Sequence, residues 1–335
     1  MQDLIKKLVE AFGPSGKEDQ VRQIVREEIE GFVNEIELSA MGSLHAISNP
    51  GGGTKVMIAA HMDEIGVIVS HVDESGFARF HNIGGVFPHT LVGHRVRFDG
   101  DVTGVIGVDA AVTTGKAPKL EQAFIDFGAE SKDECPVRVG DLGAFTRPFV
   151  KLGNRYVAKS MDDRIGVAVA IEVAKRLRNT PNEIQFAFTT QEEVGLRGAK
   201  TSAYGLDPDV GIALDVTRTG DTPKGIKMAV KLGGGPTIKV RDSGSLSDPR
   251  VVDLMVRRAE AAGIPYQLEV LQAGTTDATA IQLTRGGVPV GVISIPCRYI
   301  HTPSEMVDAG DVENAVRLLL EILSKPIELS RNLDT

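Results

Sequence analysis

Apolar residues recur along this chain in two patterns, short continuous runs and runs with helical spacing. The continuous runs end in polar residues and cover residues 56–60, 184–190, 211–214 and 291–295. Helical spacing marks residues 163–178, 248–262, 277–285 and 311–324. Strands that alternate with helices of this length predict an α/β fold, in which a largely parallel or mixed sheet is sandwiched between helices (α/β/α).

Two further helices are predicted near the N-terminus. The sequence MQDLIKKLVEAF, residues 1–12, has the pattern of an amphipathic helix. After it, Ser15 and Glu18 have the spacing of a capping box. Apolar residues then recur at helical spacing as far as Gly31. We therefore expect a second amphipathic helix that begins close to Ser15.

The stretch from about residue 67 to residue 152 has a different pattern. Its β-like runs are short, its turns are rich in glycine, and no long helical pattern interrupts them; the runs cover residues 66–72, 77–80, 94–98 and 104–108. This pattern predicts a small β-barrel-like domain, residues 67–152, inserted into the larger one. The catalytic domain would then be discontinuous, residues 1–66 and 153–335.

Composition and charge exclude several classes of protein. Hydrophobic residues make up 42% of the 335 residues and charged residues 24%, as in ordinary globular proteins. No apolar run approaches the roughly 18 residues of a membrane span. The net charge of −8, without a basic patch, disfavours nucleic acid as a partner. The N-terminus lacks the features of a signal peptide, so we expect a cytoplasmic protein, in which Cys135 and Cys297 are reduced thiols.

Metal-competent side chains follow each of the predicted strands. His61 and Asp63 follow the first, Glu192 and Glu193 the second, Asp215 the third, and His301 the fourth after five residues. Because sites in open α/β sheets form outside the carboxyl ends of the strands, these side chains are expected to converge there. Asp162 and Asp163, at the start of a predicted helix, would face the same crevice. Imidazoles and carboxylates without a thiolate suit zinc or cobalt in a catalytic site.

Each of these elements has an ordinary structural explanation when it is taken alone. An isolated His-x-Asp is usually accidental, Glu192 and Glu193 could form a solvated acidic turn, and Asp162 and Asp163 could serve only the helix N-terminus. In an extended segment the two glutamates point to opposite sides, which suggests that one binds metal and the other moves protons. The spacing alone does not separate Asp162 from Asp163.

Six motifs in order give the chain a resemblance to a known family. They are His61-Met-Asp-Glu-Ile-Gly66, Met161-Asp-Asp-Arg-Ile-Gly166, Gln191-Glu-Glu-Val-Gly-Leu-Arg-Gly198, Ala213-Leu-Asp-Val-Thr217, Gly274-Thr-Thr-Asp-Ala278 and Tyr299-Ile-His-Thr-Pro-Ser-Glu305. Over essentially its whole length the chain resembles the TET-type deblocking aminopeptidases, relatives of glutamyl aminopeptidase. The resemblance implies an α/β/α catalytic domain that carries a small β-rich domain used in assembly, often of dimers into a homododecamer.

The resemblance also implies roles for single residues. It makes Asp162 the bridge between two divalent metal ions, zinc or cobalt. His61 and Asp215 would complete one metal site, and Glu193 and His301 the other. Glu192 would be the general base and Asp63 the catalytic aspartate that orients His61. The resemblance assigns no role to Asp277, and Ser39 and Ser43 stand where relatives commonly have Asp and Asn.

These assignments lead to an expected reaction. Glu192 takes a proton from a metal-bridging water, the resulting hydroxide attacks the first peptide bond, and Glu192 returns a proton to the leaving amine. Acidic groups beside the metals would favour peptide substrates with a free N-terminus. The alternatives are another two-metal amide hydrolase, such as a carboxypeptidase or deacylase, and a non-catalytic relative of the same fold. A glycosidase is disfavoured because glycosidases generally need two carboxyl groups and no metal pair.

Overall fold

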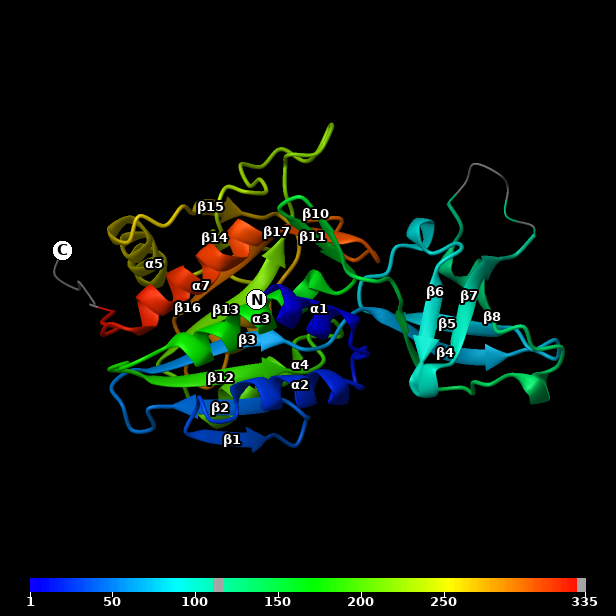
Figure 1. Ribbon diagram of the computed structural model, residues 1–335, viewed down its shortest axis with the longest axis horizontal. Helices are drawn as coiled ribbons and strands as arrows, with labels where there is room; N and C mark the ends of the chain where they lie inside the picture. The colour runs from blue at the N-terminus through cyan, green and yellow to red at the C-terminus, as the bar shows by residue number, and fades with distance from the viewer. Residues whose placement is uncertain (111, 113–116, 330–335) are drawn as a thin grey trace.

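The computed structural model describes residues 1–110, 112 and 117–329. A large sheet with helices on both faces lies at one end of the long axis, and a small barrel lies at the other (Figure 1). The barrel follows β3 directly and the chain returns from it to the large sheet through β10 and β11. The predicted fold class, a helix-covered α/β sheet with an inserted β-barrel, is confirmed.

In the described part of the chain, eleven strands form the large sheet. Its main path runs β1 (Glu35–Leu38), β2 (Leu44–Ser48), β12 (Glu183–Thr189), β3 (Lys55–His61), β13 (Val210–Thr217), β16 (Val290–Arg298), β17 (Glu305–Asp308), β11 (Arg155–Ala158) and β10 (Val150–Leu152). Strand β14 (Thr237–Arg241) pairs with β16 and with β15 (Gln267–Val270). The four central strands, β12, β3, β13 and β16, are parallel to one another. The other pairs are antiparallel, except for β14 and β15, which are parallel.

The central strands are buried on both faces, which explains their continuous apolar sequences. One face packs against α1 (Gln2–Glu10), α2 (Asp19–Ile29), α3 (Met161–Arg176), α5 (Pro249–Ala261) and α7 (Ala309–Leu323). The other face packs against α4 (Arg197–Leu206) and α6 (Asp277–Gln282). Helix α3 is buried nearly all round, so the residues at its N-terminus are fixed relative to the ends of β3 and β13.

The inserted segment closes a six-stranded barrel in the described residues. Its strands follow one another in the order β4 (Gly66–Val72), β5 (Ala78–Ile83), β8 (Ala123–Asp126), β7 (Thr103–Val108), β6 (Arg95–Phe98) and β9 (Leu142–Phe145). The barrel has a hydrophobic core of its own, which includes Val67, Phe80, Ile106 and Ile125. Among its described residues, the only helical segments are four short 3-10 turns, η1 to η4.

The predicted capping box at Ser15 and Glu18 is wrong. Helix α2 begins only at Asp19, and Glu18 stands in the N-cap position without a capping side-chain hydrogen bond. The hydroxyl of Ser15 instead donates to the carboxylate of Asp63 across 2.6 Å. Local spacing predicted a helix start, whereas a contact between segments far apart in the sequence uses both side chains.

No helix among the described residues is long and apolar enough to cross a membrane. The cytoplasmic location stays a prediction.

Candidate metal centre and active site

Two of the predicted ligands lie at the ends of neighbouring parallel strands. In the register of β3 and β13, Ala59 pairs with Ala213. His61 lies two residues after Ala59, and Asp215 lies two residues after Ala213. Side chains two residues apart in a strand point to the same side of the sheet, so His61 and Asp215 lie on the same side as this pair of alanines. Both are buried, with 2% and 6% of their surfaces exposed. The parallel register therefore brings an imidazole and a carboxylate level with each other.

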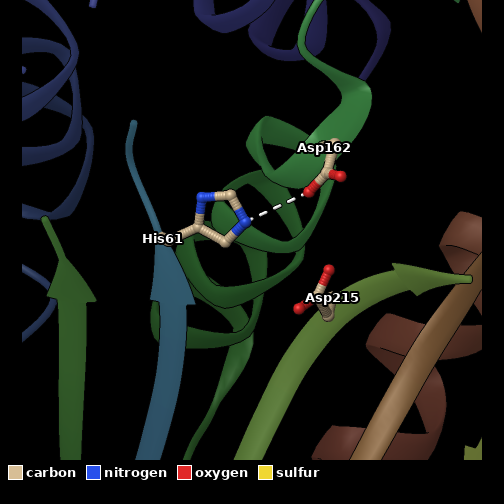
Figure 2. Close-up of side chains that lie close together, drawn as sticks. All are labelled: His61, Asp162 and Asp215. Atoms are coloured by element: carbon tan, nitrogen blue, oxygen red, sulfur yellow. Dashed lines mark hydrogen bonds and ion pairs between the residues drawn. The ribbon is translucent and has the colours of Figure 1, made fainter. Parts of the chain in front are cut away.

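Asp162 completes this group from the N-terminus of α3. Its Oδ1 lies 3.1 Å from Nε2 of His61, and the side chains of His61, Asp162 and Asp215 converge on one point (Figure 2). The possible ligand atoms of these three residues all lie within 4.8 Å of one another. The peptide bond between Asp162 and Asp163 is cis.

A second group shares Asp162. Its Oδ2 lies 3.2 Å from Nε2 of His301, and that nitrogen lies 3.3 Å from Oε1 of Glu193. The possible ligand atoms of Asp162, Glu193 and His301 also lie within 4.8 Å of one another. Each oxygen of the Asp162 carboxylate thus faces a different histidine. Asp162, rather than Asp163, is the residue that both groups contain.

The electrostatics of the site follow from crowded carboxylates and their imidazole partners. Burial raises the pKa of Asp215 well above its usual value, and the nearby charge of Asp162 raises it further. Burial also opposes ionisation of Asp162, but hydrogen bonds from His301 and His61 hold its pKa below the usual range. Burial would lower the pKa of His301, whereas its hydrogen bonds to Asp162 and Glu193 raise it to about 12. The site therefore favours bound positive charge.

The donor set fits divalent metal ions. An ion coordinated at about 2.0 to 2.2 Å by each ligand atom holds its ligands within about 4 Å of one another, close to the spacing found in both groups. Nδ1 of His61 donates to the backbone carbonyl of Asp63 across 3.1 Å, which leaves Nε2 as the nitrogen available to a metal. Imidazole and carboxylate donors without a thiolate suit zinc or cobalt.

Glu192 lies beside the two groups without belonging to either. Its Oε2 is 4.0 Å from Nε2 of His61. Burial raises the pKa of Glu192 well above its usual value, the carboxylates of Asp215 and Glu193 raise it further, and His61 opposes them. Glu192 lines a cavity of about 390 Å³ together with all five residues of the two groups and with Lys239. A buried carboxyl group of raised pKa at the wall of a cavity is suited to accept and release a proton.

The side chain of Asp63 is fully buried and accepts several hydrogen bonds. Its Oδ1 accepts from the backbone nitrogen of Glu192 across 3.0 Å, and Oδ2 accepts from that of Glu193 across 3.2 Å. Oδ1 also lies 3.5 Å from Nδ1 of His61. Burial raises the pKa of Asp63, but its contacts with His61 and Ser15 lower it below the usual value. Asp63 therefore contacts the ring of His61, a candidate ligand, and holds the backbone of Glu192, the candidate base.

Glu305 holds the ends of two ligand segments, a function that the sequence did not reveal. Its Oε2 accepts from the backbone nitrogen of Asp162 across 3.0 Å, and its Oε1 accepts from that of His301 across 2.7 Å. Burial raises the pKa of Glu305 to about 8. The one available signal was its position four residues after His301 in a motif.

The barrel reaches the site through Gly84 and Gly85, which directly follow β5. A Cβ atom added to Gly85 would lie 2.5 Å from Nδ1 of His301, and one added to Gly84 would lie 2.7 Å from a carboxylate oxygen of Glu193. Only glycine allows the backbone to approach these side chains so closely. The sequence analysis missed both residues, because a glycine pair in a loop has no distinctive spacing.

The remaining residues singled out in the sequence belong to neither ligand group and make hydrogen bonds of their own. Oδ1 of Asp163 accepts from the backbone nitrogen of Gly166 inside α3. Oδ2 of Asp277 accepts from the hydroxyl of Thr189 across 2.5 Å, and burial raises the pKa of Asp277 to about 6. Ser39 Oγ accepts from the backbone nitrogen of Ser43 across 3.0 Å, so these two serines stabilise the turn between β1 and β2.

Comparison with known proteins agrees with this fold and finds relatives along nearly the whole chain. Residues 42–318 match the family model of the M42 glutamyl aminopeptidases. A putative aminopeptidase of Acetivibrio thermocellus is 46% identical over 96% of this chain and 98% of its own length. An aminopeptidase from the archaeon Desulfurococcus kamchatkensis has a solved structure with a TM-score of 0.93 and 42% identity, over 97% of this chain and 94% of that one.

A third relative has a solved structure described as an assembly. The TET1 peptidase of Pyrococcus horikoshii, which can assemble into a tetrahedron or a large octahedral shell, matches with a TM-score of 0.88 and 30% identity, over 97% of this chain and 99% of that one. The chain belongs to the M42 glutamyl aminopeptidase family. Family membership confirms the predicted resemblance and the predicted enzyme class, a peptide hydrolase of the aminopeptidase type.

Proposed function

We propose that this enzyme is a two-metal aminopeptidase that removes N-terminal residues from peptides. The observation that carries the proposal is the Asp162 carboxylate, whose two oxygens face the histidines of two separate ligand groups. One divalent ion would be held by His61, Asp162 and Asp215, and the other by Asp162, Glu193 and His301. Bound there, zinc or cobalt ions would supply Lewis acidity, polarising the substrate carbonyl and making a water molecule more acidic.

Glu192 is the general base in this proposal. It lines the cavity beside both ligand groups, and only 10% of its side chain is exposed. Glu192 accepts the proton of the attacking water and then donates a proton to the amine that leaves. Asp63 takes part by fixing the backbone of Glu192 and the orientation of His61.

The preference for a free N-terminus follows from the charge of the cavity wall. Carboxylates of Glu192, Glu193 and Asp215 line the cavity, and negative charge there attracts the α-ammonium group of a peptide. A substrate whose amine is acylated lacks this charge. The expected partners are therefore peptides with an unblocked N-terminus.

The test compares two substrate classes after the protein has been loaded with zinc or cobalt. Amino-acid anilides carry a free α-ammonium, and N-acylated peptides lack it. Hydrolysis of anilides at least 100-fold faster than that of N-acylated peptides is the expected result. Faster cleavage of the acylated substrates would assign the site to a deacylase or carboxypeptidase, and no hydrolysis of either class with metal bound would make the chain a non-catalytic relative.

We also propose that the chain self-associates, with dimers building a homododecamer and the inserted segment, residues 67–152, acting in assembly through its barrel. The ability of the Pyrococcus horikoshii relative to form a tetrahedron supports this. The barrel also carries exposed apolar side chains, among them Val92, Val105 and Val139. Light scattering coupled to size exclusion should give the mass of twelve chains. A mass of one chain at micromolar concentration would contradict the proposal.

A further inference from the structure

Three consecutive backbone N–H groups in the turn after β12 donate to buried carboxylates. The N–H of Gln191 donates to Oε1 of Glu18 across 3.2 Å. The N–H groups of Glu192 and Glu193 donate to the two oxygens of Asp63, across 3.0 and 3.2 Å. We call residues 191–193 the catalytic turn, because they include the proposed base and a proposed ligand.

The two carboxylates are in turn held by the segment that precedes α2. The hydroxyl of Ser15 donates to Oδ2 of Asp63 across 2.6 Å, and the N–H of Gly16 donates to Oε1 of Glu18 across 2.8 Å. Ser15 and Glu18 are 6% and 4% exposed. Hydrogen bonds to ionised carboxylates are about twice as strong as neutral ones, so this buried set of bonds constrains the turn from outside the cavity.

Ser15 and Glu18 do not belong to the ligand groups, and neither lines the cavity that Glu192 lines. Glu18 caps no helix by a side-chain bond, and Ser15 precedes α2 by four residues. Their buried polar atoms are instead used on Asp63 and on the backbone of the catalytic turn. A purely structural role at the start of α2 does not explain that choice of partners.

We propose that Ser15 and Glu18 are positioning residues for catalysis, which hold Glu192 in place for proton transfer through Asp63 and through the backbone of Gln191. This inference rests on the proposed role of Glu192 as the base. A base displaced by a fraction of an ångström loses much of its effect, because proton transfer requires close, aligned contact. Substrate binding, which uses the cavity, is expected to change little.

The test uses four full-length variants. Ser15→Ala removes the hydroxyl. Glu18→Gln keeps an oxygen that can accept from Gln191, whereas Glu18→Met has a similar length and no such acceptor. Ser202→Ala is the matched control: Ser202 is also a buried serine, but its hydroxyl contacts His45 across 2.8 Å instead of the turn. The metal-free proteins are compared by hydrogen–deuterium exchange of the peptide covering residues 190–196, and the zinc-loaded proteins by anilide kinetics.

We expect faster exchange of this peptide in Ser15→Ala and Glu18→Met, with a smaller increase in Glu18→Gln and none in Ser202→Ala. We expect kcat to fall on the order of 10-fold in Ser15→Ala and Glu18→Met while KM changes less than about twofold. A higher kcat in Glu18→Gln than in Glu18→Met would show that the hydrogen bond to Gln191, rather than the packing of the side chain, holds the turn. If Glu18→Met does not fold, Ser15→Ala and Glu18→Gln still decide the question.

Unchanged exchange at residues 190–196 in Ser15→Ala would overturn the proposal. The proposal would also fail if kcat fell no further in Ser15→Ala than in the control Ser202→Ala. If the wild-type enzyme cleaves no anilide, the proposed function fails, and the exchange measurement, made without metal or substrate, still decides whether the two residues hold the turn. The two failures are therefore distinguishable.

Discussion

The carboxylate of Glu305 accepts a hydrogen bond from the backbone nitrogen of Asp162 across 3.0 Å. Its other oxygen accepts from the backbone nitrogen of His301. One buried side chain therefore fixes the backbone of the residue that both ligand groups share and of a ligand specific to one of them. Glu305 touches neither group through a ligand atom of its own, so its effect on metal binding is indirect.

Glu305→Gln should weaken metal binding about 10- to 100-fold, the usual effect of removing a group that orients a ligand. One carboxylate oxygen becomes an NH₂ group, which cannot accept the N–H of Asp162 or His301 at that position. Competition with a chelating dye measures the affinity. Glu313→Gln, at an exposed ion pair with Arg176, is the control. Equal affinities for the Glu305 variant and the wild type would show that the backbone needs no such support.

Glu192→Gln should lower the rate on the order of 100-fold or more while two metal ions still bind. The amide keeps the size of the side chain but cannot accept the proton of the attacking water. Steady-state kinetics on an amino-acid anilide give the rate, and elemental analysis gives the metal content of the same sample. A variant that retained near wild-type turnover would remove Glu192 from its role as the base.

Gly85→Ala should lower activity, because the new Cβ would lie 2.5 Å from Nδ1 of His301 and displace the imidazole. Metal affinity should fall at the group that contains His301 more than at the group that contains His61. Gly205→Ala is a matched control, since a Cβ on Gly205 meets no atom within 4 Å. Full activity in Gly85→Ala would mean that the barrel segment can retreat from the site without effect.

A buried charge cluster behind the site gives a prediction about stability. The carboxylate of Glu64 lies 2.7 Å from Nζ of Lys159 and 3.3 Å from a guanidinium nitrogen of Arg164, and all three side chains are at least 95% buried. Glu64→Gln leaves two buried cations without their counter-charge, which should lower the free energy of unfolding by about 3 kcal/mol or more. Urea denaturation measures this loss.

An exposed ion pair provides the comparison for Glu64. Glu27→Gln, which removes the ion pair of Glu27 with Lys7 at the surface, should leave the free energy of unfolding nearly unchanged, because solvent screens exposed ion pairs. A similar small change in Glu64→Gln would show that solvent or neighbouring backbone carbonyls compensate the two cations.

The sequence predicted the site where regular structure dictates it. His61 is the last residue of β3 and Asp215 lies two residues before the end of the parallel strand β13, so apolar runs followed by polar residues were enough to bring them together. Asp162 and Asp163 are adjacent, and spacing could not separate them, since the difference lies in the backbone at the start of α3. The family resemblance selected Asp162 over Asp163 as the shared ligand, and in the structure Asp162 lies between the two histidines.

Local sequence patterns did not predict contacts between segments that are far apart in the sequence. Ser15 and Glu18 have the spacing of a capping box, but a tertiary contact with Asp63 and the turn after β12 takes up their side chains. Gly84 and Gly85 matter only because the barrel lies against His301 and Glu193. Such relationships depend on how the barrel and the sheet meet, which periodicity within one segment does not determine.

The central claim is that Asp162 joins two metal sites, and counting bound metals in ligand variants tests it most directly. Isothermal titration of the metal-free protein with zinc should give two ions per chain for the wild type, and one each for Asp215→Asn and His301→Ala, which damage different groups. Asp162→Asn should weaken binding at both sites. Two ions bound with wild-type affinity in Asp162→Asn, or loss of only one site, would contradict the account.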